Sequence, residues 1–548
     1  MEKNLLLAFV LSLAAFIGWG YVVTVIQGPP PEQVISEQEL AEKVPPSPGT
    51  APQLLPGTTP GAKVTPTAPS SPETVTKSSE FPGEESTIQV STKHVTFTIT
   101  NKGAMIKSIL LPQYQTDEGE PVDLVQREEG VPLPLAIEAS DAQVTRILQN
   151  AFYDFSVSSL SLSESQPTGQ LKLTLNHDSG LSVVRELTFH HSKSLIDVQT
   201  RINAPGFAGK NLNYRVLFGP GLGGKVDSKT DHFAFSGPTT FVNNEREETP
   251  PEEITKDVFY RGDLVWTSFQ NKYFAAALIP EQGIKSAVIK KSGEHTYVGL
   301  EMESVQSAAS TSYILYAGTK GLIVLEEAGH KLVRLLDYGW LGNKFAFLVK
   351  PLLKALQYFY GLLNNYGWAI IVITFIIKII FFPLTHKSFK SMKGMQKVQP
   401  YVKVIQERHK KDRQKMNEEM LELYKKHKVN PLGGCLPMLL QVPVFIALYH
   451  ALFFSIELRG APFVGWVTDL SVADPYYVWP VMMGASMFLQ QKLNPSIGDP
   501  TQQKIMMMLP VVFTFLFMTF PAGLVIYWTT NNILTIAQQY YIYKFTKD

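Results

Sequence analysis

Lys378 is the residue of this 548-residue sequence whose surroundings most favour a chemical role. It lies in the apolar string Ile376-Ile377-Lys378-Ile379-Ile380 and is the only ionisable residue of residues 367–384. A base at the centre of a bilayer costs at least about 2.5–3.5 kcal/mol, so it must face water, a partner or a cavity. The alternative is snorkelling, in which the flexible stem carries the ammonium group toward the aqueous boundary, roughly 9 Å away by helical rise.

Other polar residues lie inside apolar runs and could share a site with Lys378. Thr374 lies one helical turn before it, on the same face of a helix. Gln441, Thr530 and Asn531 belong to two further apolar runs. Because several runs contribute polar groups, we favour a hydrated groove over an isolated snorkelling lysine.

A glycine-rich string is the nearest approach to a nucleotide-binding motif. Gly219-Pro220-Gly221-Leu222-Gly223-Gly224-Lys225 satisfies both G-x-G-x-x-G and G-x-x-x-x-G-K. Val226 stands where Ser or Thr would bind magnesium, and no helical pattern follows to offer an N-terminus to phosphate. We therefore interpret the string as a turn.

Motifs of metal-dependent or nucleophilic enzymes do not occur in the sequence. There is no H-E-x-x-H, no G-x-S-x-G and no Cys/His cluster, and the eleven His are scattered. The single Cys435 excludes an intramolecular disulfide. We expect no catalytic residue, no metal and no cofactor.

The apolar residues that must position these groups are concentrated near both ends of the chain, although the net charge is only +1. Apolar runs lie at 367–384, 432–454, 476–489 and 505–541, where a membrane-spanning helix needs roughly 20 residues. The third run is short, and we expect its helix to extend through Gln490 and Gln491. The last run is too long for one crossing, and Phe520-Pro521-Ala522-Gly523 predicts a tight turn within it. The sequence therefore predicts five crossings between residues 367 and 548.

The N-terminal part predicts an anchor and a tether. Residues 5–26 carry no charge and would span roughly 33 Å as a helix. A cleaved signal peptide is the alternative, but no small-x-small cleavage site follows, and we expect an uncleaved anchor over residues 1–27. Residues 28–85 are rich in Pro, Ser, Thr and Gly, which predicts a disordered linker.

Residues 86–320 show the period of two that is typical of strands. Val95, Phe97 and Ile99 alternate with threonines, and turn residues separate such stretches, which predicts a largely antiparallel β-sandwich. An interfacial amphipathic region is predicted for residues 321–366. Pro351 is expected to break it into an amphipathic interfacial stretch and a following helix.

The loop at residues 386–430 carries thirteen Lys or Arg against five Asp or Glu between His386 and Lys428. Positive-inside bias places this loop and both termini in the cytoplasm and the β-domain outside. Two amphipathic helices separated near residues 410–413 would form a hairpin. It is either a solvated helix pair or a docking site for anionic lipid or ribosomal RNA. The candidate docking residues are Lys390, Lys393, Lys397, Lys403, Arg408, Lys410, Lys411 and Arg413.

A series of short strings within residues 367–545 carries a resemblance to a known family. The strings are Ile373-Thr374-Phe375, Pro383-Leu384-Thr385, Val429-Asn430-Pro431-Leu432-Gly433-Gly434-Cys435, Glu457-Leu458-Arg459, Ala461-Pro462-Phe463, Asp474-Pro475-Tyr476-Tyr477, Asp499-Pro500, Gln502-Gln503-Lys504, Tyr527 and Gln538-Gln539. In this order they resemble the YidC/Oxa membrane protein insertases, and the anchor, linker and β-domain match the Gram-negative YidC type.

The resemblance implies an α-helical membrane core of five helices with a hydrophilic groove open to cytoplasm and lipid, an N-terminal anchor helix, and a periplasmic antiparallel β-supersandwich without established catalysis. It implies insertion and folding of nascent inner-membrane proteins, alone or with the Sec translocon. We expect a functional monomer in a Gram-negative inner membrane that also contacts anionic lipid. Because the sequence ends soon after the last apolar run, ribosome contact is expected through the cytoplasmic loops.

The resemblance also implies roles for single residues. Contact positions of the family carry over to Thr374 and to Trp528, where relatives often have Tyr. Tyr527, which matches the family near the start of the last apolar run, is also expected in the groove. The family usually has Arg where this sequence has Lys378, which keeps the charge but loses the bidentate guanidinium fork.

Two other functions remain open from the sequence. A secondary transporter would use Pro437, Pro443 and Pro510 to break helices around a polar site, but it predicts an internal repeat that we do not find. A membrane-anchored carbohydrate-binding protein would show activity in its isolated β-domain.

Overall fold

The structure is a computed structural model that describes residues 81, 83–116, 118–207, 209, 211–224, 234–338, 343–409, 412–427, 429, 436–493 and 500–545. The expected anchor, nearly all of the linker, and the residues Lys225 and Val226 that end the glycine-rich string lie outside the described residues.

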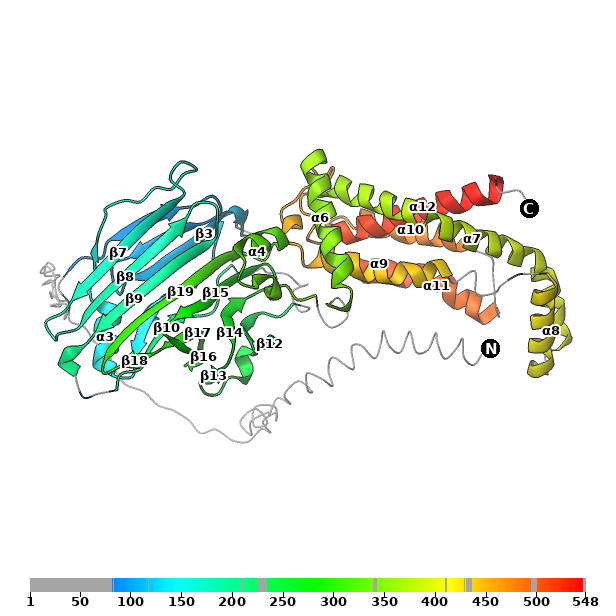
Figure 1. Cartoon of the computed structure of the whole chain (residues 1–548). Coiled ribbons are helices and arrows are strands. Elements are labelled where there is room, and N and C mark those ends of the chain that lie inside the picture. Colours follow the sequence, from blue (N-terminus) through cyan, green and yellow to red (C-terminus); the bar gives the residue numbers. More distant parts are fainter. Residues whose placement is uncertain are drawn as a thin grey trace, which may run out of the picture. The chain divides into compact units, whose positions relative to one another are not determined.

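Three antiparallel sheets form the β-domain (Figure 1), which confirms the predicted fold class of this region. The four-stranded sheet has the order β1 (Thr87–Ser91), β2 (Thr96–Thr100), β3 (Met105–Gln115) and β4 (Pro121–Asp123). The five-stranded sheet has the order β13 (Val258–Tyr260), β16 (Ile284–Ser292), β17 (His295–Met302), β10 (Tyr214–Phe218) and β5 (Ala136–Ala139). The largest sheet has the order β12 (Glu245–Glu248), β11 (Gly237–Val242), β14 (Leu264–Gln270), β15 (Phe274–Gln282), β19 (Ala308–Thr319), β9 (Leu195–Asn203), β8 (Ser182–His190), β7 (Thr168–Asn176) and β6 (Asp154–Phe155), and β18 (Ser304–Val305) pairs with β19.

Alternating side chains build the core of this domain. Leu171, Leu173 and Leu175 of β7 are buried, while the residues between them face outward. Arg185 of the neighbouring β8 is fully buried without a carboxylate partner among the described residues. Its guanidinium instead donates to the carbonyls of Ala104 and Leu135, both at 2.8 Å, and to the hydroxyl of a tyrosine in β19.

One short helix within the β-domain, α3 (Ala142–Asn150), was not expected from the sequence. Asp141 caps it, because its carboxylate accepts from the backbone N–H groups of Gln143 and Val144. Its apolar residues are buried against the sandwich, so the helix fits within a domain whose pattern is otherwise that of strands.

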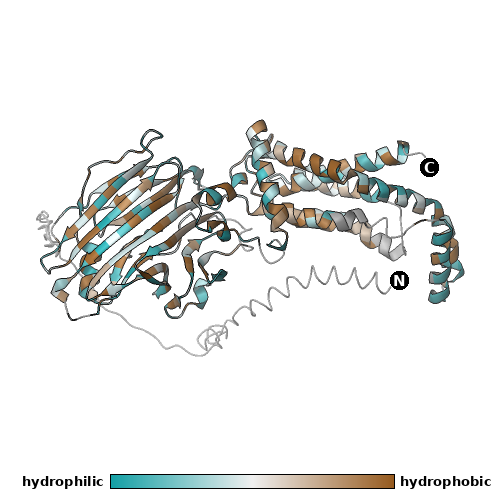
Figure 2. Cartoon of the chain, in the orientation of Figure 1, coloured by the Kyte–Doolittle hydropathy of each residue, from teal (hydrophilic) through white to brown (hydrophobic). Residues whose placement is uncertain are grey.

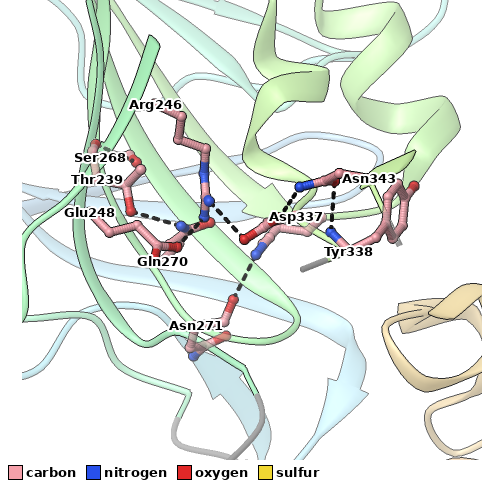
Figure 3. A network of polar contacts seen from close by, with 10 residues as sticks. Thr239, Arg246, Glu248, Ser268, Gln270, Asn271, Asp337, Tyr338 and Asn343 are labelled. Carbon is pink, nitrogen blue, oxygen red and sulfur yellow. Dashed lines mark hydrogen bonds and ion pairs between the residues drawn. The ribbon is translucent and has the colours of Figure 1, made fainter. Parts of the chain in front are cut away.

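A polar network fixes the chain that follows the β-domain (Figure 3). After α4 (Leu322–Ala328) and the 3-10 turn η4 (Leu332–Leu335), Asp337 accepts from Arg246 of β12 at 2.9 Å and from Asn343 at 2.7 Å. Arg246 also donates to Glu248 at 2.6 Å. The approach to the next helix is thereby held at the end of the largest sheet.

That next helix, α6 (Ala346–Leu363), runs through Pro351, so the prediction that this proline breaks the region was wrong. The missing N–H leaves only the carbonyl of Phe347, near the helix start, without its usual partner. Val349, Leu353 and Leu356 are buried along one face, and this packing holds the helix in one piece.

The remaining helices lie where the apolar runs and the basic loop predict them. They are α7 (Tyr366–Arg408), α8 (Arg413–Lys426), α9 (Leu436–Phe453), α10 (Val478–Leu493), α11 (Pro500–Phe517) and α12 (Ala522–Phe545). Within the described part of the chain, α7 alone is long and apolar enough to cross a bilayer by length and composition, while α9 and α11 contain shorter apolar stretches. The predicted tight turn separates α11 from α12.

Two of the prolines that a transporter would use to break helices lie inside helices that continue through them. Pro443 lies inside α9 and Pro510 inside α11. The broken helices that a secondary transporter would need are therefore not formed at these two prolines.

At Gly484, α10 and α11 approach so closely that a Cβ would lie 1.9 Å from Thr514 Oγ1.

The character of α7 changes along its length from hydrophobic to hydrophilic (Figure 2). Its second half and α8 form the hairpin that the basic loop predicts, with Tyr401 stacked on His427 at 5.8 Å between ring centres. Phe389 and Met392 of this half are buried against Ile542 of α12, so the chain itself covers these two apolar side chains. Residues 404–422 belong to a separate unit, in which His409 lies 3.0 Å from Glu419.

Candidate functional site

Three residues of α12 place polar groups along one face of that helix. Tyr527, Asn531 and Thr535 follow one another at intervals of four residues, which aligns their side chains. Just before them on the helix, Leu524, Val525 and Ile526 are buried in the hydrophobic core of the helices. We call these three residues, together with Lys378 and Gln441, the polar seam.

Gln441 connects α9 to the seam. Its amide nitrogen donates to the hydroxyl oxygen of Tyr527 at 3.0 Å and to the amide oxygen of Asn531 at 3.1 Å. Tyr527 is 2% exposed, so this contact lies inside the bundle and not on its surface.

Lys378 connects α7 to the same face of α12. Its ammonium group donates to Thr535 Oγ1 at 2.8 Å, and that hydroxyl donates in turn to the backbone carbonyl of Asn531 at 2.6 Å. The seam is therefore one connected set of polar contacts across α7, α9 and α12.

The positive charge of Lys378 has no fixed partner of opposite sign. No carboxylate of the described residues lies within the 4.0 Å of an ion pair, and its one acceptor is a neutral hydroxyl. The side chain is half-buried. A cation in this setting is favoured by any negative or strongly polar group that comes close to it.

The segment between α9 and α10 closes one end of the bundle over the start of α12. Its residues Leu458 and Leu470 are fully buried, and its backbone accepts from the N–H groups of Ala522 and Gly523. Asp474 is 1% exposed and accepts from Trp466 Nε1 and from the backbone N–H groups of residues 476 and 479, at 2.8–3.1 Å. These contacts give the seam a closed, rigid end.

Three residues expected in the groove lie apart from the seam contacts. Thr374 is 1% exposed and donates to the carbonyl of Ile370 in its own helix at 2.6 Å. Trp528 packs against Phe445 with ring centres 4.5 Å apart, and Thr530 is half-buried. The structure thus brings Lys378, Gln441, Tyr527 and Asn531 together.

Sequence reasoning missed Thr535, the direct partner of Lys378. The available signal was its spacing, four residues after Asn531 and eight after Tyr527. A second polar set on α12 was also not foreseen as a contact set: Asn532 donates to Ser486 Oγ of α10 at 3.0 Å, and Gln538 donates to Thr385 Oγ1 of α7.

The expected docking residues lie along the second half of α7 and beyond it. Lys390, Lys397, Lys403 and Arg408 are exposed, and Lys393 is half-buried. Lys410, Lys411 and the side chain of Arg413 lie outside the described residues.

Side chains that could bind a metal ion do not gather in the described ranges, where no group of three His, Cys, Asp or Glu is found. The His190 imidazole at the end of β8 instead lies 2.8 Å from the Asp197 carboxylate.

Comparison with known proteins assigns both halves of the chain. Residues 358–548 match the family described as 60Kd inner membrane protein, and residues 87–355 match the YidC periplasmic domain. The membrane protein insertase YidC of Geobacter metallireducens is 38% identical over 558 aligned residues, which cover 99% of this chain and 98% of that protein. The chain belongs to the YidC family of membrane protein insertases. Its relatives include the insertase of Geobacter sulfurreducens, 41% identical over 81% of this chain and 84% of that protein.

Among solved structures, an active YidC insertase with its first transmembrane domain resolved is 20% identical, with a TM-score of 0.35, and covers 82% of this chain and 91% of that one. The family assignment rests on the sequence relatives. It confirms the resemblance found in the short strings, and with it a five-helix core joined to a periplasmic β-domain in an inner-membrane protein.

Proposed function

We propose that this chain inserts inner-membrane proteins by holding a hydrated segment of the client against the polar seam. The observation that carries the proposal is the ammonium group of Lys378, which faces a neutral hydroxyl and no carboxylate among the described residues. The closed end beside α12 supports a path that enters from the opposite end of the bundle.

The energetics need no nucleotide. A charge in a polar, hydrated setting lowers the cost of drawing an acidic client segment part-way into the bilayer. The apolar helix of the client then leaves the seam for lipid, where burial contributes about 25 cal/mol per Å² of apolar surface. Sliding of the client thus supplies the free energy, while the seam lowers the barrier.

We propose the orientation that follows from positive-inside bias, with both termini and the basic hairpin in the cytoplasm and the β-domain in the periplasm. The proposed domains are residues 1–27, 28–85, 86–320, 321–366 and 367–548. Proposed partners are nascent inner-membrane proteins, the Sec translocon, anionic lipid, and the ribosome at the hairpin, whose exposed bases support contacts with phosphate.

Replacement of Lys378 tests the proposal. Lys378→Arg keeps the charge and is expected to retain activity, whereas Lys378→Leu removes the charge and the polar contact to α12. Lys378→Gln should fall between, because it keeps a polar group. The measurement is protease protection of matched clients with zero, one or two acidic residues in the translocated tail.

The Leu variant should lose most insertion with two acidic residues and least with none. If it inserted all three clients equally at normal protein levels, Lys378 would only snorkel and the proposed mechanism would be wrong.

A further inference from the structure

Thr535 is the neutral partner of Lys378, and its hydroxyl has a defined direction. Its single proton is given to the carbonyl of Asn531 at 2.6 Å, so an oxygen lone pair is left for the ammonium group at 2.8 Å. The direction of both hydrogen bonds is fixed, because a lysine ammonium group can only donate and a backbone carbonyl can only accept.

The position of Thr535 opposes the tendency of a lysine side chain in a bilayer to extend its ammonium group toward water. A free Lys stem extends toward water, and the boundary of the α7 apolar run lies about 9 Å away by helical rise. Thr535 offers an acceptor from a different helix at the depth of the seam instead. In addition, Asn531 is held from the other side by Gln441, so the acceptor belongs to a braced segment of α12.

We propose that Thr535 is a positioning residue that holds the Lys378 charge inside the seam and directs it toward the client. This inference rests on the proposed function, in that the held cation meets acidic client segments. Of the three ammonium protons, one is given to Thr535, and no other described residue accepts from the remaining two. The hydrogen bond to Thr535 therefore orients the ammonium group, and with it the other two protons, without neutralising the positive charge.

The variants Thr535→Val and Thr535→Ser separate positioning from packing. Val keeps the volume and branching of Thr but removes the acceptor, whereas Ser keeps the hydroxyl. Thr529→Val is the matched control, because Thr529 is a buried threonine of the same helix whose hydroxyl is bonded to its own backbone at Val525.

The first measurement is labelling of the Lys378 amine by a water-soluble acylating reagent added from the cytoplasmic side, quantified by mass spectrometry. Thr535→Val should increase labelling about threefold, the factor that corresponds to an average interhelical hydrogen bond in a membrane. Thr535→Ser and Thr529→Val should label as the native chain does. Unchanged labelling of Thr535→Val would overturn the inference, whatever the role of Lys378 proves to be.

The second measurement is insertion of the clients with zero, one or two acidic tail residues. Thr535→Val should impair the two-acid client about threefold more than the neutral one, and adding it to Lys378→Gln should cause no further charge-dependent loss. A loss that is equal for all clients would mean a structural role and would also overturn the inference. In that case a charge-dependent defect of Lys378→Leu would leave the proposed function standing.

Discussion

Lys320, at the end of β19, is a buried cation with charges of both signs around it. Its ammonium group donates to the carbonyl of Asn271 at 3.0 Å. Burial, followed by the nearby positive charge of Arg246, lowers the pKa of Lys320 from 10.5 to about 7, although Asp337 and Glu248 act in the opposite direction. This residue therefore couples the stability of the β-domain to pH.

The sign of that coupling follows from proton binding. Between about pH 7 and pH 10.5 the unfolded chain binds more protons at Lys320 than the folded chain. The free energy of unfolding should rise with pH across this window, by up to about 1.4 kcal/mol per pH unit from this group, and should be insensitive to it below about pH 7. Urea unfolding of the full chain in detergent at pH 7.5, 8.5 and 9.5, followed by the β-sheet circular dichroism signal, measures the slope.

Lys320→Met should flatten this dependence, because methionine fills a similar volume and does not titrate. Lys193→Met is the control, since Lys193 is exposed and should keep the native slope. Equal slopes in the native chain and in Lys320→Met would show that Lys320 titrates alike in the folded and unfolded chain.

Single residues of the seam were predictable to the extent that they violate the apolar pattern. Lys378 and Gln441 are costly inside apolar runs, and that cost alone marks them. Thr535 is not costly, because a threonine can satisfy its hydroxyl on its own helix, as Thr374 does. Its contact with Lys378 depends on the rotation of α12 relative to α7. The residue pattern within one helix does not determine that rotation.

At the scale of elements, the second half of α7 is the clearest candidate for docking. Its bases Lys390, Lys397 and Lys403 are exposed. The apolar residues that are buried in this half are Phe389, Met392, Met395 and Val398. Replacing these three lysines by Gln should weaken binding of ribosomes to the chain in nanodiscs of neutral lipid. It should also reduce the slope of log affinity against log salt by about 2, because fewer counterions are released.

A matched loss of three charges on the β-domain provides the control. Lys193, Lys256 and Lys285 are exposed, and their replacement by Gln should leave ribosome binding unchanged. If both triple variants bound ribosomes as the native chain does at every salt concentration, the hairpin would be a solvated helix pair only.

The elements themselves followed from periodicity, with two exceptions. The strands, the five core helices and the hairpin lie where alternation and apolar runs predict them. The helix α3 was missed because nine residues with a local cap give little signal within a strand-rich region. The prediction for Pro351 was wrong because tertiary packing of the buried face holds α6 together, and the local sequence does not show that packing.

At the scale of the whole molecule, the helical core combines a rigid closed end with a polar interior. The segment between α9 and α10 secures the start of α12, and the seam follows along the same helix. The outer faces of the core are apolar, as at Phe515 of α11, which is 66% exposed. Under the proposed function, a client segment would be polar on the seam side and apolar on the lipid side at once.

The most direct test maps where a client tail lies during insertion. A ribosome-stalled client carries a photoreactive residue beside its acidic tail, and mass spectrometry identifies the residues of the native chain that it cross-links. We expect cross-links beside Lys378, Gln441 and Thr535, which are lost in Lys378→Leu. Cross-links confined to the side of α12 that contacts α10, beside Asn532 and Ser486, or to the hairpin alone, would contradict the account.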